Sequence, residues 1–462
     1  MELCDLFSSL VRTAIYPLHE RLVGRKTMKF VRELDWSQWM APDDIRCLQS
    51  AKLKVLLRHA WHNVPFYRRR LENAGIQDLG DDTWAMLARL PLLSKDEIRT
   101  SISAMTWHEA PGGVFPHDTG GSSGEPLTFV VDRRRQGYDQ AARIRTHRWF
   151  GVDLGDHELL LWGSPIERQR TDEIKSLRDA VCNQRLLDAF RMSPARVDEY
   201  FDEWDRFRPT CLFGYPSSIA LFVERARLRQ RQLDGSRLRA VFVTGEVCMP
   251  DDREAIESHF GVPVADGYGS REGGFIAHQC PKGGMHITAE NIIVEVVRDG
   301  RAVEAEETGE IVITHLDAYA MPFIRYRTGD VGRLLRGRCA CGRGLPLMDV
   351  VQGRTTDFLY LPDGTVKHAL SVIYPLRQTP GVRRFQVTQH PDFTITIDVV
   401  TDPSVVGVDA DTIGRRVRPV FGDSVSVAVR FVECIETAES GKFRHVISHA
   451  RPATRNRDPL HV

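Results

Sequence analysis

Apolar residues recur along this chain with the periods of helices and strands, and the two kinds of segment alternate through most of its length. From 42 to 60 they come at steps of three and four, which is typical of one buried helix face. Short apolar runs bounded by glycine or proline indicate strands. The expected helices are 42–60, one beginning at Ser94, 133–150, 193–208, 250–260 and 411–420. The expected strands are 127–131, 158–162, 239–244, 262–266, 291–297, 309–315, 330–335, 385–388, 393–400 and 424–432.

The segment from 239 to 266 has the clearest α/β pattern. Two apolar runs flank a helix that begins near Pro250 and stops at Gly261. Such a unit predicts parallel strands, whose ligands bind at their carboxyl ends. Gly245-Glu246 and the stretch 267–272 follow the two strands directly. Both are therefore expected at the ligand-binding edge of the sheet.

The alternating pattern predicts an α/β fold with two domains. Residues 1–353 are expected to form a large N-terminal domain of parallel and mixed sheets with helices, beginning with a helical segment. Residues 354–462 change to short strands around one helix, which predicts a small α+β domain. A length of 462 residues leaves room for this division.

Composition narrows the class of partner. The 62 basic and 62 acidic residues cancel, so nothing calls for nucleic acid. Nine cysteines, an odd number, favour reduced thiols or metal ligands and a cytoplasmic location. The first 22 residues are interrupted by charges and predict an amphipathic helix rather than a signal peptide or membrane span. Weak membrane association through that helix is left open.

A loop rich in glycine and hydroxyl residues lies between Asp118 and Leu127. Its glycines, Gly120, Gly121 and Gly124, let backbone N–H groups converge, and Thr119, Ser122 and Ser123 add donors. The loop can therefore cradle a polyphosphate. By itself the pattern is equally typical of a turn or linker.

Five motifs in order carry a family resemblance. They are Thr119–Gly124, Tyr268-Gly269-Ser270-Arg271-Glu272, Arg325–Asp330, Gly353–Asp357 and Ser440-Gly441-Lys442-Phe443-Arg444. The series resembles the signature of adenylate-forming enzymes, and the early segments 58–67 and 213–218 are similar to those of the phenylacetate–CoA ligase and CapK-like family. The likeness extends over nearly the whole chain.

The resemblance implies a reaction and a set of roles. A carboxylate attacks the α-phosphate of ATP, pyrophosphate leaves, and a nucleophile then displaces AMP. The chemistry needs positioning and charge neutralisation. The catalytic residues implied are Lys442, between carboxylate and α-phosphate, Glu272, on Mg²⁺, and Thr119 of the phosphate loop.

The nucleotide-binding set implied by the resemblance is larger. Tyr268 is expected against the adenine and Asp330 on the ribose, with Arg354 near it. The remaining members are Gly120, Gly121, Ser122, Ser123, Gly124, Gly245, Glu246, Gly269, Ser270 and Arg271. The large domain is then an adenylation domain, and the small one a mobile lid that pivots near 353–357. For Asp330, Arg354 and Lys442 the plain alternatives are a turn residue and two solvated charges.

Two departures from the family pattern affect these expectations. Many relatives carry a lysine just after the proline of the phosphate loop, where this chain has Leu127. Some phosphate charge must therefore be met elsewhere. The stretch 359–364 replaces an Arg-Gly-rich turn of phenylacetate ligases, which weakens the expectation of CoA as acceptor.

Three cysteines and a histidine suggest a metal site. Cys280 and His286 lie in one glycine-rich knuckle, and Cys339 and Cys341 in another within 280–341. This is a closed tetrahedral zinc set of the structural kind, with His278 in reserve. The alternative is that these are ordinary buried or free cysteines.

The leading hypothesis is an AMP-forming ligase that joins a small carboxylic acid, aryl or arylacetic, to coenzyme A, with ATP, Mg²⁺ and structural Zn²⁺. An amide ligase with an amine acceptor is the alternative in the same chemical class, and a non-catalytic nucleotide-binding protein is the alternative of another class. Trp149, Phe150, Tyr215 and Phe275 are candidates for the wall of the acid pocket, or plain core. A homodimer is expected only on base rates.

Overall fold

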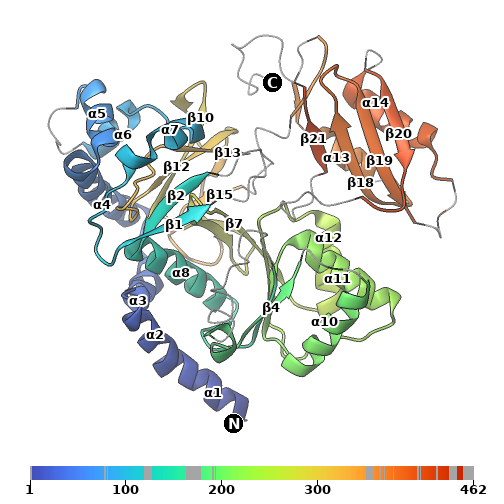
Figure 1. Ribbon diagram of the computed structural model, residues 1–462, viewed down its shortest axis with the longest axis horizontal. Coiled ribbons are helices and arrows are strands. Elements are labelled where there is room, and N and C mark those ends of the chain that lie inside the picture. The colour runs from blue at the N-terminus through green and yellow to red at the C-terminus, as the bar shows by residue number, and fades with distance from the viewer. Residues whose placement is uncertain are drawn as a thin grey trace. The chain divides into compact units, whose positions relative to one another are not determined.

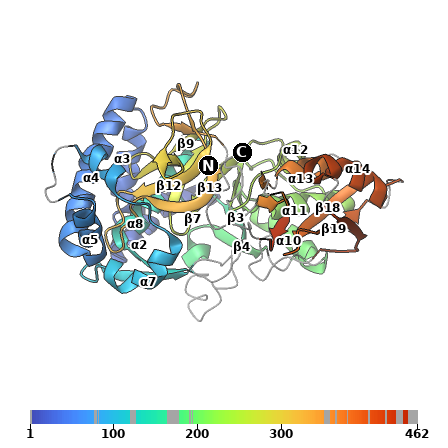
Figure 2. The same cartoon turned by 90° about the horizontal axis from the view of Figure 1, so that it is seen from above.

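The computed structural model describes residues 3–76, 80, 82–118, 127–162, 178–189, 192, 194–349, 358–363, 366–368, 370–377, 379–402, 405, 407–422, 425–435 and 445–450. The chain forms two compact units (Figures 1 and 2). The first comprises 1–296, 302–328 and 332–350, and the second comprises 297–301, 329–331 and 351–462. The predicted boundary after 353 falls in an undescribed stretch and stays a prediction.

Helices dominate the beginning of the first unit. In chain order the described helices of this unit are α1 (Leu3–Leu10), the π-helical η1 (Val11–Ile15), α2 (Tyr16–Leu22), α3 (Thr27–Ser37), α4 (Pro42–Asn63), α5 (Pro65–Asn73), α6 (Thr83–Arg89), α7 (Lys95–Met105), α8 (Arg133–Arg148), α10 (Pro194–Phe207), α11 (Pro216–Leu228) and α12 (Pro250–Phe260). The predicted helix at Ser94 is confirmed, since Ser94 and Glu97 form a capping box that satisfies the free backbone donors of α7.

A nine-stranded sheet is the frame of the first unit, in the order β14-β15-β9-β8-β7-β6-β5-β3-β4. Its strands are β3 (Glu158–Trp162), β4 (Gln184–Asp188), β5 (Cys211–Gly214), β6 (Ala240–Thr244), β7 (Val264–Ser270), β8 (Gly274–Gln279), β9 (Met285–Ile287), β14 (Leu334–Leu335) and β15 (Leu347–Met348). The run from β4 to β7 is parallel, which confirms the predicted β6-α12-β7 unit. The strands from β7 to β14 are antiparallel.

Strand β7 is longer than predicted. The sequence suggested that it ends near 266, but it continues to Ser270 and turns directly into β8. Tyr268, Gly269 and Ser270 therefore belong to a strand and not to a loop. Pairing with β8 supplies hydrogen bonds that a glycine-rich sequence did not reveal.

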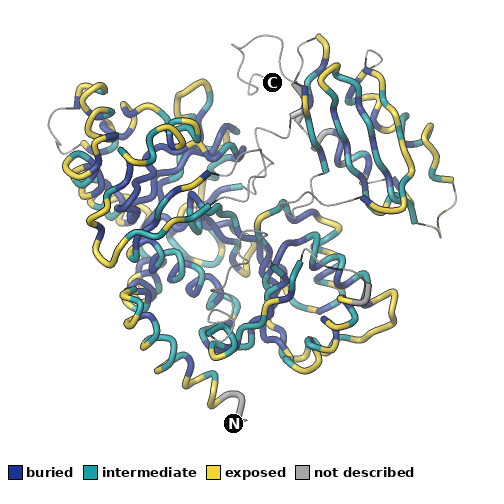
Figure 3. Tube along the Cα trace, viewed as in Figure 1, coloured by how far each residue is buried: buried dark blue, intermediate teal, exposed yellow. Residues whose placement is uncertain are grey.

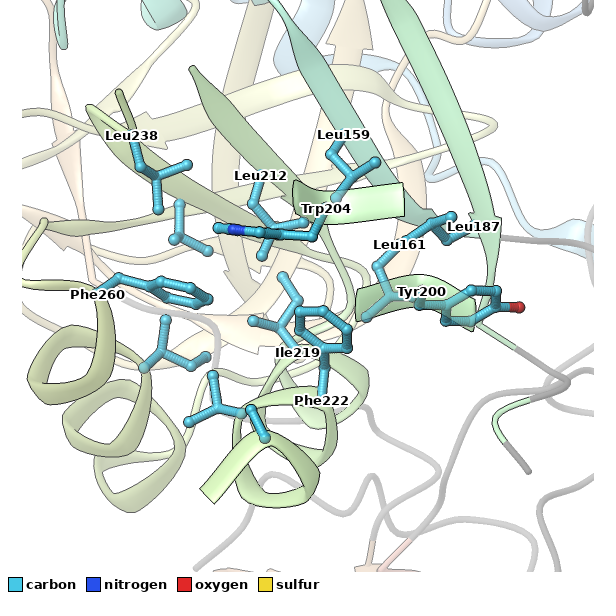
Figure 4. Packing of buried hydrophobic residues seen from close by; sticks show 14 of the residues in the cluster. Leu159, Leu161, Leu187, Tyr200, Trp204, Leu212, Ile219, Phe222, Leu238 and Phe260 are labelled. Atoms are coloured by element: carbon cyan, nitrogen blue, oxygen red, sulfur yellow. The ribbon is translucent and has the colours of Figure 1, made fainter. Parts of the chain in front are cut away.

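The central sheet has apolar residues on both faces. Val241 and Val243 pack with α10, α11 and α12 on one face, whereas Ala240 and Phe242 pack with Val152 on the other. In the first cluster Trp204 stacks on Phe260, with ring centroids 5.0 Å apart (Figure 4). The aromatic stripe of the predicted 193–208 helix is thus core.

A hairpin and a smaller sheet complete the strands outside the C-terminal segment. Strands β1 (Val114–Asp118) and β2 (Thr128–Asp132) form the antiparallel hairpin. The four-stranded sheet has the order β11-β10-β12-β13, with β10 (Ile292–Arg298), β11 (Arg301–Ala302), β12 (Gly309–His315) and β13 (Tyr326–Gly332). The expected strand 330–335 was misplaced, because β13 begins at Tyr326 and Asp330 lies inside it. The residues that begin β13 are mostly polar, so the sequence there resembles that of a loop. In the structure, Arg325 just before the strand has a positive φ.

The N-terminal helices pack on the body and leave one apolar stripe exposed. Phe30 of α3 stacks on Tyr138 of α8, with centroids 3.9 Å apart. Leu10, Leu18 and Leu22 of the first helices remain exposed, as Figure 3 shows for this segment. Among the described residues, no helix has the length and apolar character needed to cross a membrane.

The second unit is an α+β structure. It contains β16 (Phe358–Tyr360), β17 (Val366–His368), α13 (Leu370–Arg377), β18 (Val382–Gln389), β19 (Ile395–Thr401), α14 (Ala410–Phe421), β20 (Val427–Phe431) and β21 (Val446–Ser448). Its main sheet has the order β20-β19-β18-β21. The strands predicted around 385, 393 and 424 and the helix at 411 are confirmed; β16, β17, α13 and β21 were missed because they are short or lack a clear period.

We expect Trp204→Ala to lower the free energy of unfolding by about 3–5 kcal/mol, because it removes a fully buried ring from the cluster on α10, α11 and α12. Urea unfolding measures the loss. Leu228→Ala is the matched control, since Leu228 is exposed on α11 and its truncation should cost little. Equal losses for the two variants would contradict this account of the core.

Candidate nucleotide site and metal cluster

Gly245 follows β6 at the carboxyl edge of the parallel strands. Its φ is +83°, and a Cβ there would lie 3.0 Å from Cε1 of Tyr215 and 3.4 Å from Cη2 of Trp162. These two rings are stacked, with centroids 4.1 Å apart and planes inclined by 16°. Only glycine suits this backbone conformation beside the aromatic pair. Glu246, the next residue, accepts a 2.6 Å hydrogen bond from Ser217 Oγ.

Residues 268–271 lie on the neighbouring strand end and the turn that follows it. Thr244 of β6 pairs with Gly267 of β7, and its hydroxyl donates to the Gly267 carbonyl at 2.6 Å. Gly267 leaves little room for a side chain, because a Cβ would lie 3.1 Å from Cδ2 of the buried His278. The structure thus brings the predicted group Gly245, Glu246 and Tyr268–Arg271 to one edge of one sheet.

Glu272 lies in the turn between β7 and β8 and is only 7% exposed. Its Oε1 accepts a 3.1 Å hydrogen bond from the Tyr326 hydroxyl. Lys95 Nζ lies 3.7 Å from the same oxygen. A buried carboxylate next to one cation and one hydroxyl remains available as a hard oxygen ligand, and carboxylate oxygens are what Mg²⁺ prefers. The residue therefore fits its predicted role.

Helix α8 holds this turn from behind through Arg135. Its Nη2 donates to the carbonyls of Arg271 and Glu272 at 2.8 and 2.6 Å. The guanidinium is 1% exposed and lies over the Phe129 and Phe323 rings, at 5.6 and 5.4 Å. Such a charge-assisted contact fixes the backbone that carries Glu272.

Asp139, one helical turn after Arg135, supports the same turn. Its Oδ1 accepts from the Phe275 N–H at 3.3 Å and lies 3.6 Å from His315 Nε2. Burial raises the pKa of Asp139, but the neighbouring His315 ring, the charge of Arg135 and the hydrogen bond from the Phe275 N–H outweigh it and hold the pKa below its usual value. A Cβ on Gly274 would lie 2.4 Å from this carboxylate, so glycine is required there.

The phosphate loop, residues 119–126, lies outside the described residues. The residues on either side of the loop are described. Asp118 pairs with Thr128 across the hairpin and accepts a 2.6 Å hydrogen bond from the Thr128 hydroxyl. Arg271 Nη1 donates to the Asp118 carbonyl at 2.6 Å. The base of the loop thus lies beside the residue that precedes Glu272.

Several predicted residues cannot be placed. Thr119, Gly120, Gly121, Ser122, Ser123, Gly124, Arg354 and Lys442 lie outside the described residues. Asp330 is described; it lies on β13 and is 7% exposed. A buried strand residue is not the ordinary turn residue that was the alternative for it.

The four predicted metal ligands do converge. One ligand atom each of Cys280, His286, Cys339 and Cys341 lies within 4.8 Å of the others. Cys280 Sγ is 3.6 Å from Cys339 Sγ, and Cys341 Sγ is 3.1 Å from His286 Nε2. Three thiols and one imidazole in this arrangement fit tetrahedral zinc. Gly284 passes so close that a Cβ would lie 2.7 Å from Cys339 Sγ.

The proposed reserve ligand, His278, does not join this group. Its Nδ1 lies 2.9 Å from the Gln279 carbonyl, and its ring packs against Phe275, with centroids 5.6 Å apart. Burial lowers the pKa of His278 to about 4. The ring of Trp149 packs edge-on against His286, with centroids 5.7 Å apart, and its indole N–H donates a hydrogen bond to Gln38 Oε1. Trp149 thus borders the cysteine cluster, whereas Tyr215 borders Gly245.

Two regions of the chain match models of known protein families. Residues 187–317 match the family model described as AMP-binding enzyme, and residues 359–449 match the CapK C-terminal domain. Over these two regions the chain is similar to adenylate-forming enzymes. The resemblance found in its motifs is confirmed, and so is the predicted fold class.

The curated proteins to which the chain is similar are phenylacetate–coenzyme A ligases. That of Escherichia coli strain K12 is 28% identical over 343 residues, covering 71% of this chain and 75% of the relative. That of Thermus thermophilus is 25% identical over 346 residues, covering 69% and 72%. Their AMP-forming ligase class is the one predicted here.

Solved structures of the same fold include a 2-hydroxyisobutyryl-CoA ligase in the postadenylation state, with TM-score 0.71 and 22% identity, covering 89% of this chain and 91% of that one. The amide bond synthetase McbA from Marinactinospora thermotolerans also shares the fold, with TM-score 0.51 and 21% identity, covering 72% and 68%.

Sequence reasoning missed the residues that support the motifs. Tyr326 meets the turn that carries Glu272 and lies inside the 325–330 motif, although no role was predicted for it. Arg135, Asp139 and Lys95 meet the same turn but come from two other elements, α8 and α7. No local pattern marks them. The only signal was the capping box at Ser94, which fixes where α7 begins and hence where Lys95 projects.

We expect Arg135→Leu to lower the free energy of unfolding by about 1–3 kcal/mol, because two buried carbonyls lose their donor. Chemical denaturation measures the loss. Arg206→Leu, on the exposed face of α10, is the control and should change stability by less than about 0.5 kcal/mol. A similar small change for Arg135→Leu would mean that the arginine does not hold the turn.

Proposed function

We propose that the chain is an ATP-dependent ligase that joins a small carboxylic acid to AMP, releases pyrophosphate and transfers the acyl group to coenzyme A. The observation that carries this is the meeting of Glu272, Tyr326 and Lys95 beside the base of the phosphate loop. It occurs in a chain with both an AMP-binding and a CapK C-terminal domain.

The proposal gives the chain's residues the following roles, of which those of Thr119, Lys442 and Arg354 rest on the motif resemblance alone. Glu272 would hold Mg²⁺, which when bound neutralises phosphate charge. Arg135 and Asp139 keep the Glu272 turn in position, and Tyr326 orients its carboxylate. Thr119 and the loop after it bind the leaving phosphates, Tyr268 binds adenine, and Asp330 binds ribose. Lys442 bridges the carboxylate and the α-phosphate, and Arg354 assists near the ribose.

We infer that the acid is aromatic. Trp162 and Tyr215 form a flat stack beside Gly245, and Phe213 lies 5.4 Å from the Trp162 ring. A planar apolar group packs well against such rings. The phenylacetate ligases named above act on an acid of this class. Tyr215, named among the wall candidates, belongs to this stack.

An amine acceptor is the second candidate within the same chemistry. The unusual stretch 359–364 begins as strand β16, and Gln389 bonds both the N–H and the carbonyl of Tyr360, at 2.9 and 2.6 Å. The stretch that departs from the phenylacetate-ligase pattern is therefore hydrogen-bonded to strand β18 of the second unit. The shared fold of an amide bond synthetase is consistent with it. A non-catalytic nucleotide-binding protein has less support, because Glu272 and Asp330 are both retained and buried.

We further propose that Cys280, His286, Cys339 and Cys341 bind structural zinc. The four residues come from two segments, 280–286 and 339–341, and backbone contacts near them join these segments to each other and to Gln38. His286 pairs with Leu347 between β9 and β15, and the Gly344 N–H donates to the Gln38 carbonyl at 2.9 Å. A closed set of ligands without a place for substrate is typical of a structural site. A cytoplasmic location and a homodimer remain predictions.

The ligase proposal predicts pyrophosphate release from ATP that depends on the acid supplied. A coupled phosphate assay over a panel of aryl, arylacetic and short aliphatic acids measures it. We expect aromatic acids to give the highest kcat/KM, and added coenzyme A to yield a thioester detectable by mass spectrometry. Amines in place of coenzyme A test the second candidate.

Lys442→Ala is the mechanistic control for that panel. Losing a preorganised charge at the developing bond should reduce acid-dependent release by about 10²-fold or more, while ATP binding changes little. No release with any acid, together with ATP binding by the wild-type protein, would favour the non-catalytic alternative.

The zinc proposal predicts stoichiometric zinc in protein purified without chelators, measured by elemental analysis. Cys339→Ser should lose the metal and lower the Tm, because the tie between the two knuckles is broken. Cys47→Ser is the control, since Cys47 is an exposed free thiol. Absence of zinc with an unchanged Tm in Cys339→Ser would refute the site.

A further inference from the structure

The position after the phosphate loop offers no charge. Leu127 directly follows the phosphate loop and its proline, and its side chain is 1% exposed in the core. A triphosphate that enters this site still needs cations near its β- and γ-phosphates. Because Leu127 points into the interior, that charge has to come from another element.

Lys95 is in position to supply it. Its Nζ lies 3.7 Å from Glu272 Oε1, the oxygen that also accepts from the Tyr326 hydroxyl. The distance is that of an ion pair and exceeds a normal hydrogen bond. The ammonium group can therefore donate to a further acceptor while it stays beside Glu272. Its side chain is 29% exposed, so a ligand can reach it.

The backbone around Lys95 is fixed by long-range hydrogen bonds. The Leu93 N–H donates to the Arg325 carbonyl at 2.8 Å, and the Arg327 N–H donates to the Leu93 carbonyl at 2.9 Å. Leu93 is thus paired with β13 in a parallel bridge. Arg325 adds hydrogen bonds from Nη1 to the carbonyls of Ala88 and Leu90.

The start of α7 is equally well defined. Ser94 Oγ accepts from the Glu97 N–H at 3.2 Å, and Glu97 Oε2 accepts from the Ser94 N–H at 2.9 Å. Lys95 is the first residue of this helix. The pairing with β13 and the cap together determine the position from which the lysine extends.

The same place is next to the phosphate loop. Arg271 binds the Asp118 carbonyl, one residue before the loop, and Glu272 follows Arg271. Helix α7 also packs against β2, the strand that leaves the loop. Lys95 therefore lies where the loop begins, on the side of Glu272.

We propose that Lys95 binds the β- and γ-phosphate oxygens of ATP and so supplies the cation that Leu127 does not. This rests on the adenylation proposed above. In that reaction a carboxylate oxygen bonds to the α-phosphorus, and the bond to the bridging oxygen breaks with its electron pair leaving on pyrophosphate. Lys95 stabilises that departing charge, and in the unliganded protein it pairs with Glu272.

The experiment compares nucleotides that differ only in these phosphates. Isothermal titration calorimetry without added Mg²⁺ or chelator measures the Kd of ATP and of AMP for the wild-type protein and for Lys95→Met. We expect ATP to bind about tenfold more weakly to the variant, the loss typical of one charge-assisted hydrogen bond. AMP, which lacks both phosphates, should bind with a Kd within about twofold of the wild-type value.

Two further variants separate binding from structure. Lys29→Met removes an exposed lysine that pairs with Glu33 on α3, and should leave both Kd values unchanged. Lys95→Arg keeps the charge and should retain most of the ATP affinity. If Lys95→Met does not fold, Lys95→Gln takes its place in the titration, since its amide keeps most of the side-chain volume.

Equal weakening for ATP and AMP would mean that Lys95 only supports the fold, and an unchanged ATP Kd would mean that it does not touch the phosphates. Either result overturns the proposal and leaves the ligase assignment intact. A wild-type protein that binds neither nucleotide and releases no pyrophosphate would overturn both.

Discussion

The geometry of the candidate site depends on one buried guanidinium. Arg135 emerges from the first turn of α8 and donates to two successive carbonyls, those of Arg271 and Glu272. Within the described residues, the hydrogen bonds of this buried guanidinium are made by Nη2, and both go to these carbonyls, so the carbonyls and the arginine constrain each other. The turn between β7 and β8 is therefore a rigid platform, and the carboxylate of Glu272 has a fixed origin.

Charges of both signs are then placed around that platform at little cost in solvation. Glu272 is buried but meets Tyr326 and Lys95, while Arg271 is engaged at the base of the phosphate hairpin. Asp139 is ionised because His315 and Arg135 favour its charged form. The site is thus electrostatically organised before any ligand arrives, which is the condition under which charge stabilisation is most effective.

The sequence predicted what is local and missed what is made by distant pairing. The β6-α12-β7 unit was predicted correctly because the signals for it are local. Its apolar residues have the spacing of strands and a helix, Gly261 ends the helix, and two strands joined by such a helix are parallel. The three cysteines and His286 could be grouped from ligand chemistry alone. The meeting of Lys95 and Tyr326 at Glu272 could not be predicted, because it depends on a backbone bridge between Leu93 and β13. The start of β13 was missed because its first residues, 326–330, are mostly polar or glycine and lack the apolar pattern of a strand. The roles of Thr119, Lys442 and Arg354 rest on sequence alone.

The bridge between Leu93 and Tyr326 also bears on how the chain can vary. The AMP-binding match begins at residue 187, yet Lys95, Asp118 and Arg135 all precede it. A fragment cut to the matched region would keep Tyr268 and Glu272 but lose the helices that anchor and neutralise them. Substitutions in α7 can change the charge beside Glu272 without altering any of the five motifs. The surroundings of a signature residue are thus set partly by an N-terminal segment that lies outside the signatures.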